Sequence, residues 1–210
     1  MEQIEIWSEQ DRKKRSGKMR HEIREWIQES MSTKQQIYHS VAMTNQIERA
    51  AVLMINTIKN GGTIFVCGNG GSASDSAHFV GEMLNRFTLK REYPLAAIDL
   101  SAQNSTITAI ANDYSFDDIF AKQIQALGTD GDMLLAISTS GNSHNVNQAV
   151  TEANAQGMEI VYLTGLHGPR RTTRMQAINV PSTNTPIIQE SHIMIIHILC
   201  HLIDEALEGK

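Results

Sequence analysis

Apolar residues along this chain switch between helical and strand-like spacing. Over residues 33–60 they recur every three or four positions, and Gly61 and Gly62 follow, which predicts a helix that ends at these glycines. Residues 63–67 are a short apolar run that leads into further glycines. Such a run is typical of a strand buried on both faces. The pattern therefore predicts a helix followed by a buried strand.

The same alternation continues through the rest of the chain. Further strands are predicted at 95–100, 133–137, 160–163 and 177–180, and helices at 73–86, 119–127 and 143–156. Strands that alternate with helices form a parallel sheet covered by helices on both faces. The predicted fold class is therefore α/β, with three layers.

The two ends of the chain depart from this pattern. Residues 1–30 are polar with scattered apolar positions such as Ile23, Trp26 and Ile27, which predicts a helical arm on the surface or on a partner subunit. From Ile187 onward the final predicted helix is apolar on nearly every face, so it must be buried. We expect an N-terminal helical arm over 1–32 and one α/β domain over 33–210.

Composition is that of an ordinary soluble protein. The 210 residues are 41% hydrophobic and 20% charged, with four prolines, which suits one compact domain. A net charge of -5 lacks the excess of lysine and arginine that marks a nucleic-acid-binding domain, and the basic cluster at 12–20 is typical of a solvated face. We expect no direct contact with nucleic acid.

The cysteines and the apolar runs predict a cytoplasmic location. Cys67 and Cys200 lie far apart inside apolar segments, which favours reduced, buried thiols. The N-terminus has no apolar signal core, and the run at 193–203 is too short to cross a bilayer and contains two histidines. We expect neither secretion by that route nor a membrane-embedded protein.

Two predicted connections from strand to helix have the same design. Residues 66–72 and 137–143 each pass from a strand end through small residues into a helix start. Glycine lets the backbone approach a ligand, hydroxyls donate hydrogen bonds, and a helix N-terminus offers free N–H groups, so an anion such as phosphate fits. Either loop alone is more commonly a capped tight turn. Two such loops at the carboxyl ends of parallel strands favour a ligand site.

Two titratable residues follow the first of these loops. His78 and Glu82 are four residues apart and therefore share one face of the predicted helix. This spacing suits an acid/base pair or a metal pair, and it also suits a simple hydrogen bond on a helix surface. The nearby loop favours the functional interpretations.

The final helix carries polar residues that need partners because they stand among apolar ones. They are Gln189, His192, His197 and His201. Gln189 and His197 are about 80° apart around a helix and can converge through long side chains, whereas His197 and His201 have the four-residue spacing. Spacing alone leaves both pairs open.

Five motifs, in their order and spacing, resemble those of the phosphoheptose isomerases, which belong to the sugar isomerase (SIS) fold family. They are CGNGGS at 67–72, HFVGE at 78–82, AND at 111–113, ISTSGNS at 137–143, and QESH at 189–192 followed by His197. The resemblance extends from about Gln36 to Glu208, so the arm lies outside it.

The resemblance implies a flavodoxin-like sheet and a homotetramer with active sites between subunits. It implies an aldose–ketose isomerase that holds one zinc ion per subunit. The implied reaction converts the small-molecule sugar phosphate sedoheptulose 7-phosphate to D-glycero-D-manno-heptose 7-phosphate through an enediol. This is the first step towards the ADP-heptose precursor of the bacterial lipopolysaccharide core.

The resemblance also implies roles for individual residues. The catalytic pair is Glu82, as the base on carbon, and His197, as the group that serves the oxygens. The implied zinc ligands are His78, Glu82, Gln189 and His197. The implied phosphate cradle is Ser138, Thr139, Ser140 and Ser143. The other implied substrate contacts are Asn69, Gly70, Gly71, Ser72, Glu82, Asn112, Asp113 and Gln189.

One departure and two rival functions bear on this interpretation. Pro186 stands where these isomerases often have an acidic residue, which affects substrate preference and rate. A non-catalytic relative that binds the bacterial replication initiator keeps the loops but lacks the equivalents of Glu82 and His197. A sugar-phosphate-binding regulatory module needs no such pair either. Because this chain has both residues, the sequence favours the isomerase.

Overall fold

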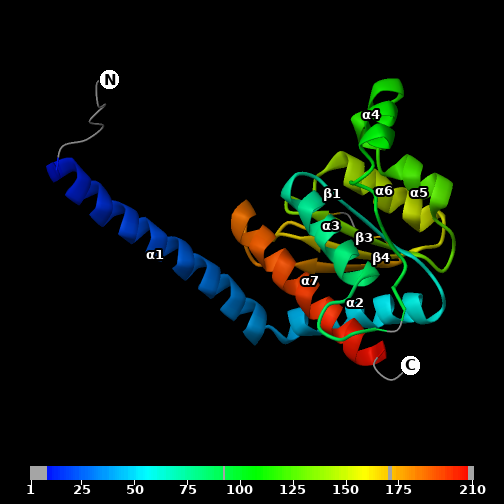
Figure 1. Ribbon diagram of the computed structural model, residues 1–210, viewed down its shortest axis with the longest axis horizontal. Helices are drawn as coiled ribbons and strands as arrows, with labels where there is room; N and C mark the ends of the chain where they lie inside the picture. Colours follow the sequence, from blue (N-terminus) through cyan, green and yellow to red (C-terminus); the bar gives the residue numbers. More distant parts are fainter. Residues whose placement is uncertain (1–8, 92, 170–171, 208–210) are drawn as a thin grey trace.

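Five parallel strands form the middle layer of the computed structural model, which describes residues 9–91, 93–169 and 172–207 (Figure 1). Their order across the sheet is β2-β1-β3-β4-β5, which is the flavodoxin-like order. The predicted α/β class is therefore confirmed. The strands are β1 (Ile64–Gly68), β2 (Ala97–Asp99), β3 (Met133–Ser138), β4 (Glu159–Thr164) and β5 (Met175–Asn179).

Helices cover both faces of this sheet, because alternate residues of each strand point to opposite sides. Ile64 and Val66 of β1 join the core beneath α2 (Val41–Lys59), α3 (Gly71–Leu84) and α7 (Thr185–Leu207). Phe65 and Cys67 join the second core, beneath α5 (Ala121–Leu127) and α6 (His144–Ala155). Both cysteines are buried and free, as predicted.

The N-terminal helix α1 (Glu9–His39) continues past the predicted end of the arm, so the single helix predicted over 33–60 is wrong in its first part. The division into an arm and a domain stays a prediction. The helix ends at His39 because Ser40 caps the next one, with its hydroxyl accepting from the Met43 N–H at 3.3 Å. Most of α1 extends away from the sheet (Figure 1), while Ile37 near its end is buried in the core. Residues 1–8 of the predicted arm lie outside the described residues.

Two helical elements have no counterpart in the predictions: α4 (Asn104–Asp113) and the 3-10 helix η1 (Phe116–Asp118). Neither contains a buried residue. Without a buried face a helix does not need the apolar spacing by which helices are recognised in a sequence. This is why the hydrophobic pattern missed them.

The last helix, α7, is buried as predicted, although it is longer than the apolar run suggested. By length and composition alone its 23 residues could cross a membrane, but half of its most apolar stretch is buried inside the protein. Core helices of soluble proteins have the same length and composition, so this helix is weak evidence for a membrane span.

Candidate functional site

The first small-residue loop connects β1 to α3. Gly70 caps α3 with a positive φ of 56°, a conformation that glycine adopts without strain. At Gly68 a Cβ would lie 2.6 Å from the Ser72 carbonyl oxygen, so a side chain has no room there. Ser72 itself is buried. The loop therefore presents backbone rather than side chains at the N-terminus of α3.

The second loop gathers three hydroxyl groups at the N-terminus of α6. The Ser138 hydroxyl lies 2.9 Å from that of Ser143 and 3.5 Å from that of Ser140. Ser143 occupies the cap position of α6 without a capping bond from its side chain, so its hydroxyl is free to face Ser138. Gly141 makes the turn with φ 70°. Hydroxyls grouped at a helix N-terminus suit an anion.

An asparagine pair joins the two loops, which sequence reasoning did not anticipate. Asn69 and Asn145 exchange two side-chain hydrogen bonds of 2.8 and 2.9 Å. Behind the second loop, the Asn147 amide donates to the Gly141 carbonyl at 3.1 Å and accepts from the Tyr162 hydroxyl at 2.9 Å. Asn145 and Asn147 lie on α6, where nothing in the spacing marks them as support for the loops.

The titratable residues meet where α3 packs against α7. The Nε2 atoms of His78 and His197 are 2.9 Å apart, and His78 Nε2 is 3.5 Å from Glu82 Oε1. For a hydrogen bond between them, one of these nitrogens must be protonated and donate, and the other must accept. The side chains of His78 and Glu82 are 43% and 23% exposed, so solvent reaches the group. Phe87 packs beside the His197 ring, with centroids 5.3 Å apart.

Gln189 connects this group to the first loop. A Cβ on Gly71 would lie 1.6 Å from Gln189 Nε2, which means that the amide group occupies the space a side chain would fill. Gln189 thus lies against Gly71, as His197 lies against His78. The helices α3 and α7 therefore run side by side, and both ends of this contact carry predicted site residues.

The structure does not bring every candidate to this contact. Asn112 and Asp113 are exposed on α4 and hydrogen-bond to each other at 2.8 Å, on a helix that projects beyond the sheet (Figure 1). His201 is exposed. His192 is fully buried, and burial lowers the pKa of its imidazole to about 4, so this ring is neutral near pH 7.

The residues at the α3–α7 contact suit a zinc ion by their chemistry. Two imidazole nitrogens and a carboxylate oxygen are donors that zinc takes, and ligand atoms around tetrahedral zinc lie about 3.3 Å apart when its bonds are about 2.0 Å. The separations of 2.9 and 3.5 Å lie on either side of that value. Among the described residues no three His, Cys, Asp or Glu side chains are grouped closely enough to hold a metal ion as they stand.

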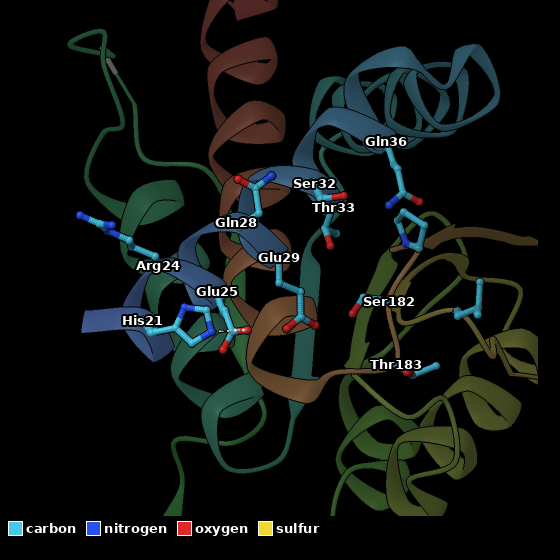
Figure 2. Close-up of a pocket in the computed structure, with 12 residues that line it drawn as sticks. His21, Arg24, Glu25, Gln28, Glu29, Ser32, Thr33, Gln36, Ser182 and Thr183 are labelled. Atoms are coloured by element: carbon cyan, nitrogen blue, oxygen red, sulfur yellow. Dashed lines mark ion pairs between the residues drawn. The ribbon is translucent and has the colours of Figure 1, made fainter. Parts of the chain in front are cut away.

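A separate cavity of about 810 Å³ lies between α1 and the segment after β5 (Figure 2). On its α1 side His21 pairs with Glu25 at 3.1 Å, and Ser182 and Thr183 line the other side. None of the predicted site residues is among the described residues that line it. The predicted site residues therefore lie elsewhere, at the α3–α7 contact, in the two small-residue loops and on α4.

Comparison with known proteins gives consistent matches. The SIS domain family matches residues 25–165. The phosphoheptose isomerase of Shewanella frigidimarina is 50% identical over 193 residues, which cover 90% of this chain and 96% of that protein. The structure of phosphoheptose isomerase GmhA from Neisseria gonorrhoeae is 40% identical with a TM-score of 0.82, covering 89% of this chain and 99% of that one. A phosphoheptose isomerase from Francisella tularensis is 40% identical with a TM-score of 0.84, covering 88% and 97%.

Proposed function

Because the chain belongs to the SIS domain family and, within it, to the phosphoheptose isomerases, we propose that it converts sedoheptulose 7-phosphate to D-glycero-D-manno-heptose 7-phosphate. The observation that carries this proposal is the position of His197. It approaches His78 to 2.9 Å from a different helix, beside Glu82. A carboxylate and an imidazole thereby lie together at the α3–α7 contact, and the other end of this contact, at Gly71, belongs to the first small-residue loop.

The exchange of an aldose and a ketose needs one base and one acid. A proton leaves the carbon beside the carbonyl and returns to the neighbouring carbon through an enediol. Glu82 is the proposed base on carbon, and His197 moves protons at the substrate oxygens. The Glu82 side chain is 23% exposed, which supports this role, since a base on carbon must be accessible to the substrate.

The substrate phosphate is held by the second loop. Ser138, Ser140 and Ser143 supply the grouped hydroxyls, and Thr139 follows Ser138 in the same turn. The N-terminus of α6 adds backbone N–H groups and its positive dipole end. The first loop, with Asn69, lies beside the second through the Asn145 pair, which supports a role in holding the sugar.

Zinc is the proposed cofactor. Its proposed ligands are His78, Glu82 and His197, which lie together, and Gln189, which the resemblance implies and which lies against Gly71 at the other end of the α3–α7 contact. When bound, such an ion polarises the carbonyl or enediolate oxygen of the substrate. The protein's own part is to hold these donors on two packed helices, while Glu82 remains the base.

The proposed assembly is a cytoplasmic homotetramer. Reduced, buried cysteines support that location. Apolar side chains on α1 are about half exposed and repeat at helical spacing, which supports contact with partner subunits. They are Met19, Ile23, Trp26, Ile27 and Met31.

The test follows sedoheptulose 7-phosphate turnover by NMR in the zinc-loaded wild type and in Glu82→Gln and His197→Ala. We expect kcat to fall on the order of 10²- to 10⁴-fold in both variants, the usual share of a general acid or base. His201→Ala is the matched control, because this histidine is exposed one turn further along α7. It should keep wild-type turnover.

No turnover by the zinc-loaded wild type, or equal turnover in all four proteins, would refute the assignment. The rival function, a non-catalytic protein that binds the replication initiator, predicts the first of these results. It is not favoured, because the relatives at 50% identity are phosphoheptose isomerases.

A further inference from the structure

The last turn of α3, which carries Glu82, is held from outside the helix. A helix leaves its final carbonyls without partners inside the helix, and other groups must supply them. Here the Gly81 carbonyl still has a helical bond, from the N–H of the C-cap residue Asn85 at 3.1 Å. The Met83 carbonyl accepts from outside the helix, from the Leu95 N–H at 3.0 Å. The Glu82 carbonyl, between them, accepts from the Arg91 guanidinium.

Arg91 is also paired with α7. Its Nε lies 3.2 Å from Asp204 Oδ1, and the two side chains are only 7% and 0% exposed. The N–H is not aligned for a hydrogen bond, so this contact is an electrostatic one between buried charges. One guanidinium thus connects the backbone of Glu82 to the helix that carries His197.

The second oxygen of Asp204 fixes the segment between α3 and Arg91. Asp204 Oδ2 accepts from the backbone N–H groups of Thr88 at 2.9 Å and Leu89 at 3.0 Å. Asp204 follows His197 by two helical turns and therefore lies on the same face of α7. Phe87, the residue before Thr88, packs on the His197 ring. The part of this segment from Phe87 to Leu89, together with Arg91, is therefore held against this face of α7.

We propose that Arg91 and Asp204 are positioning residues, which hold the backbone of Glu82 at a set distance and orientation from His197. This inference rests on the proposed function. Neither residue is assigned a contact with substrate or metal. Their effect is on geometry, and a misplacement of about 1 Å at a reacting group costs on the order of 10²-fold in rate.

The experiment measures kcat, KM and thermal unfolding for Arg91→Met, Arg91→Lys and Asp204→Asn. In folded Arg91→Met we expect kcat to fall on the order of 10²-fold while KM stays within about twofold, because loss of an interaction made only in the transition state leaves KM unchanged. Arg91→Lys, which keeps a cation, should recover part of the lost kcat. If Arg91 only stabilised the fold, its replacement would lower the unfolding temperature and leave kcat of the folded enzyme unchanged.

Two further variants complete the experiment: a double variant in case the single ones fail to fold, and a control at an exposed ion pair. Arg91→Met combined with Asp204→Asn removes both buried charges together, and such pairs are often replaced without loss of stability. Arg174→Met is the matched control, because Arg174 and Glu159 are also 3.2 Å apart but are 48% and 36% exposed. The control should keep wild-type kcat.

The results separate this proposal from the proposed function. Wild-type turnover tests the reaction. Amide hydrogen exchange at Asn85 and Leu95, whose N–H groups bond to the carbonyls on either side of Glu82, reports how firmly the end of α3 is held. It should speed up in Arg91→Met even if the substrate is a different one. Unchanged kcat in the folded variants, a rise in KM at constant kcat, or loss of fold in every variant including the double one would overturn the proposal.

Discussion

At Gly71 the absence of a side chain makes room for the amide group of Gln189. The sequence marked this glycine as a loop residue near a ligand, because small residues surround it. In the structure its neighbour is instead a residue of the last helix, so that close approach of α7 to α3 is what requires glycine here. The size of one residue thus sets how a distant helix approaches the candidate site.

We predict that Gly71→Ala lowers kcat/KM by at least tenfold while the protein stays folded. The new Cβ would lie 1.6 Å from Gln189 Nε2, and the end of a flexible side chain moves at lower cost than the helix that bears it. Activity with sedoheptulose 7-phosphate and the unfolding temperature are the two measurements.

Gly81→Ala is the control for this substitution. Gly81 lies on the same helix, and nothing is within 4 Å of a Cβ built there. Alanine in a helix is more stable than glycine by about 0.5 to 1 kcal/mol, so the control should be slightly more stable than wild type. Full activity in Gly71→Ala would show that the position of Gln189 does not matter.

Among the elements, α7 combines opposite environments along one helix. His197 faces α3, His201 is exposed, and His192 is fully buried. Three histidines of one helix therefore have three different surroundings. A buried imidazole favours its neutral form, since the interior solvates charge poorly, and burial lowers the pKa of His192 to about 4.

The burial of His192 predicts that the free energy of unfolding decreases as the pH is lowered below about 6.5. The unfolded chain binds a proton at His192 near its ordinary pKa of 6.5, whereas the folded protein binds it only near 4, so acid favours unfolding between these values. We expect this residue to account for about 2 kcal/mol of the stability lost between pH 7.5 and pH 5.

Urea unfolding at the two pH values measures this effect in wild type, His192→Gln and His201→Gln. The His192 variant should lose less stability on acidification than wild type, whatever its stability at neutral pH. The exposed His201 serves as the control and should behave as wild type does. An identical pH dependence in all three proteins would contradict the prediction.

At the scale of the whole molecule, most of α1 does not pack on the sheet. Much of it extends from the body (Figure 1) and is tied to α7 near its C-terminal end, where Lys34 Nζ lies 2.6 Å from Glu190 Oε1. Trp26 and Ile27 remain about half exposed. Large apolar side chains grouped on an exposed helix are typical of a surface that another chain covers.

We predict that Trp26→Glu breaks the proposed homotetramer into smaller species. A carboxylate placed in an apolar interface has no partner and is costly to bury. Light scattering coupled to gel filtration gives the mass of each species. Leu127→Glu is the control, because Leu127 is 54% exposed on α5, away from α1, and should leave the mass unchanged. The same mass for Trp26→Glu and wild type would exclude α1 from the assembly.

Local patterns in the chain were enough to predict the sheet. Strands and helices alternate with distinct apolar periods, and the predicted strands at 63–67 and 133–137 agree with β1 and β3 to within one residue. The break at Ser40 and the exposed helix α4 were not predicted. The first depends on a single capping hydrogen bond within a continuous helical pattern, and the second has no buried face.

The sequence by itself determined the α/β order, the two small-residue loops and the shared face of His78 and Glu82, because each depends on residues close together in the chain. Only the tertiary structure decided that His197 faces His78, that Asn69 pairs with Asn145, and that Arg91 joins Asp204. These contacts depend on how α7 is rotated and how it packs against α3. The packing of the whole core sets that rotation, and the spacing of residues within one helix does not specify it.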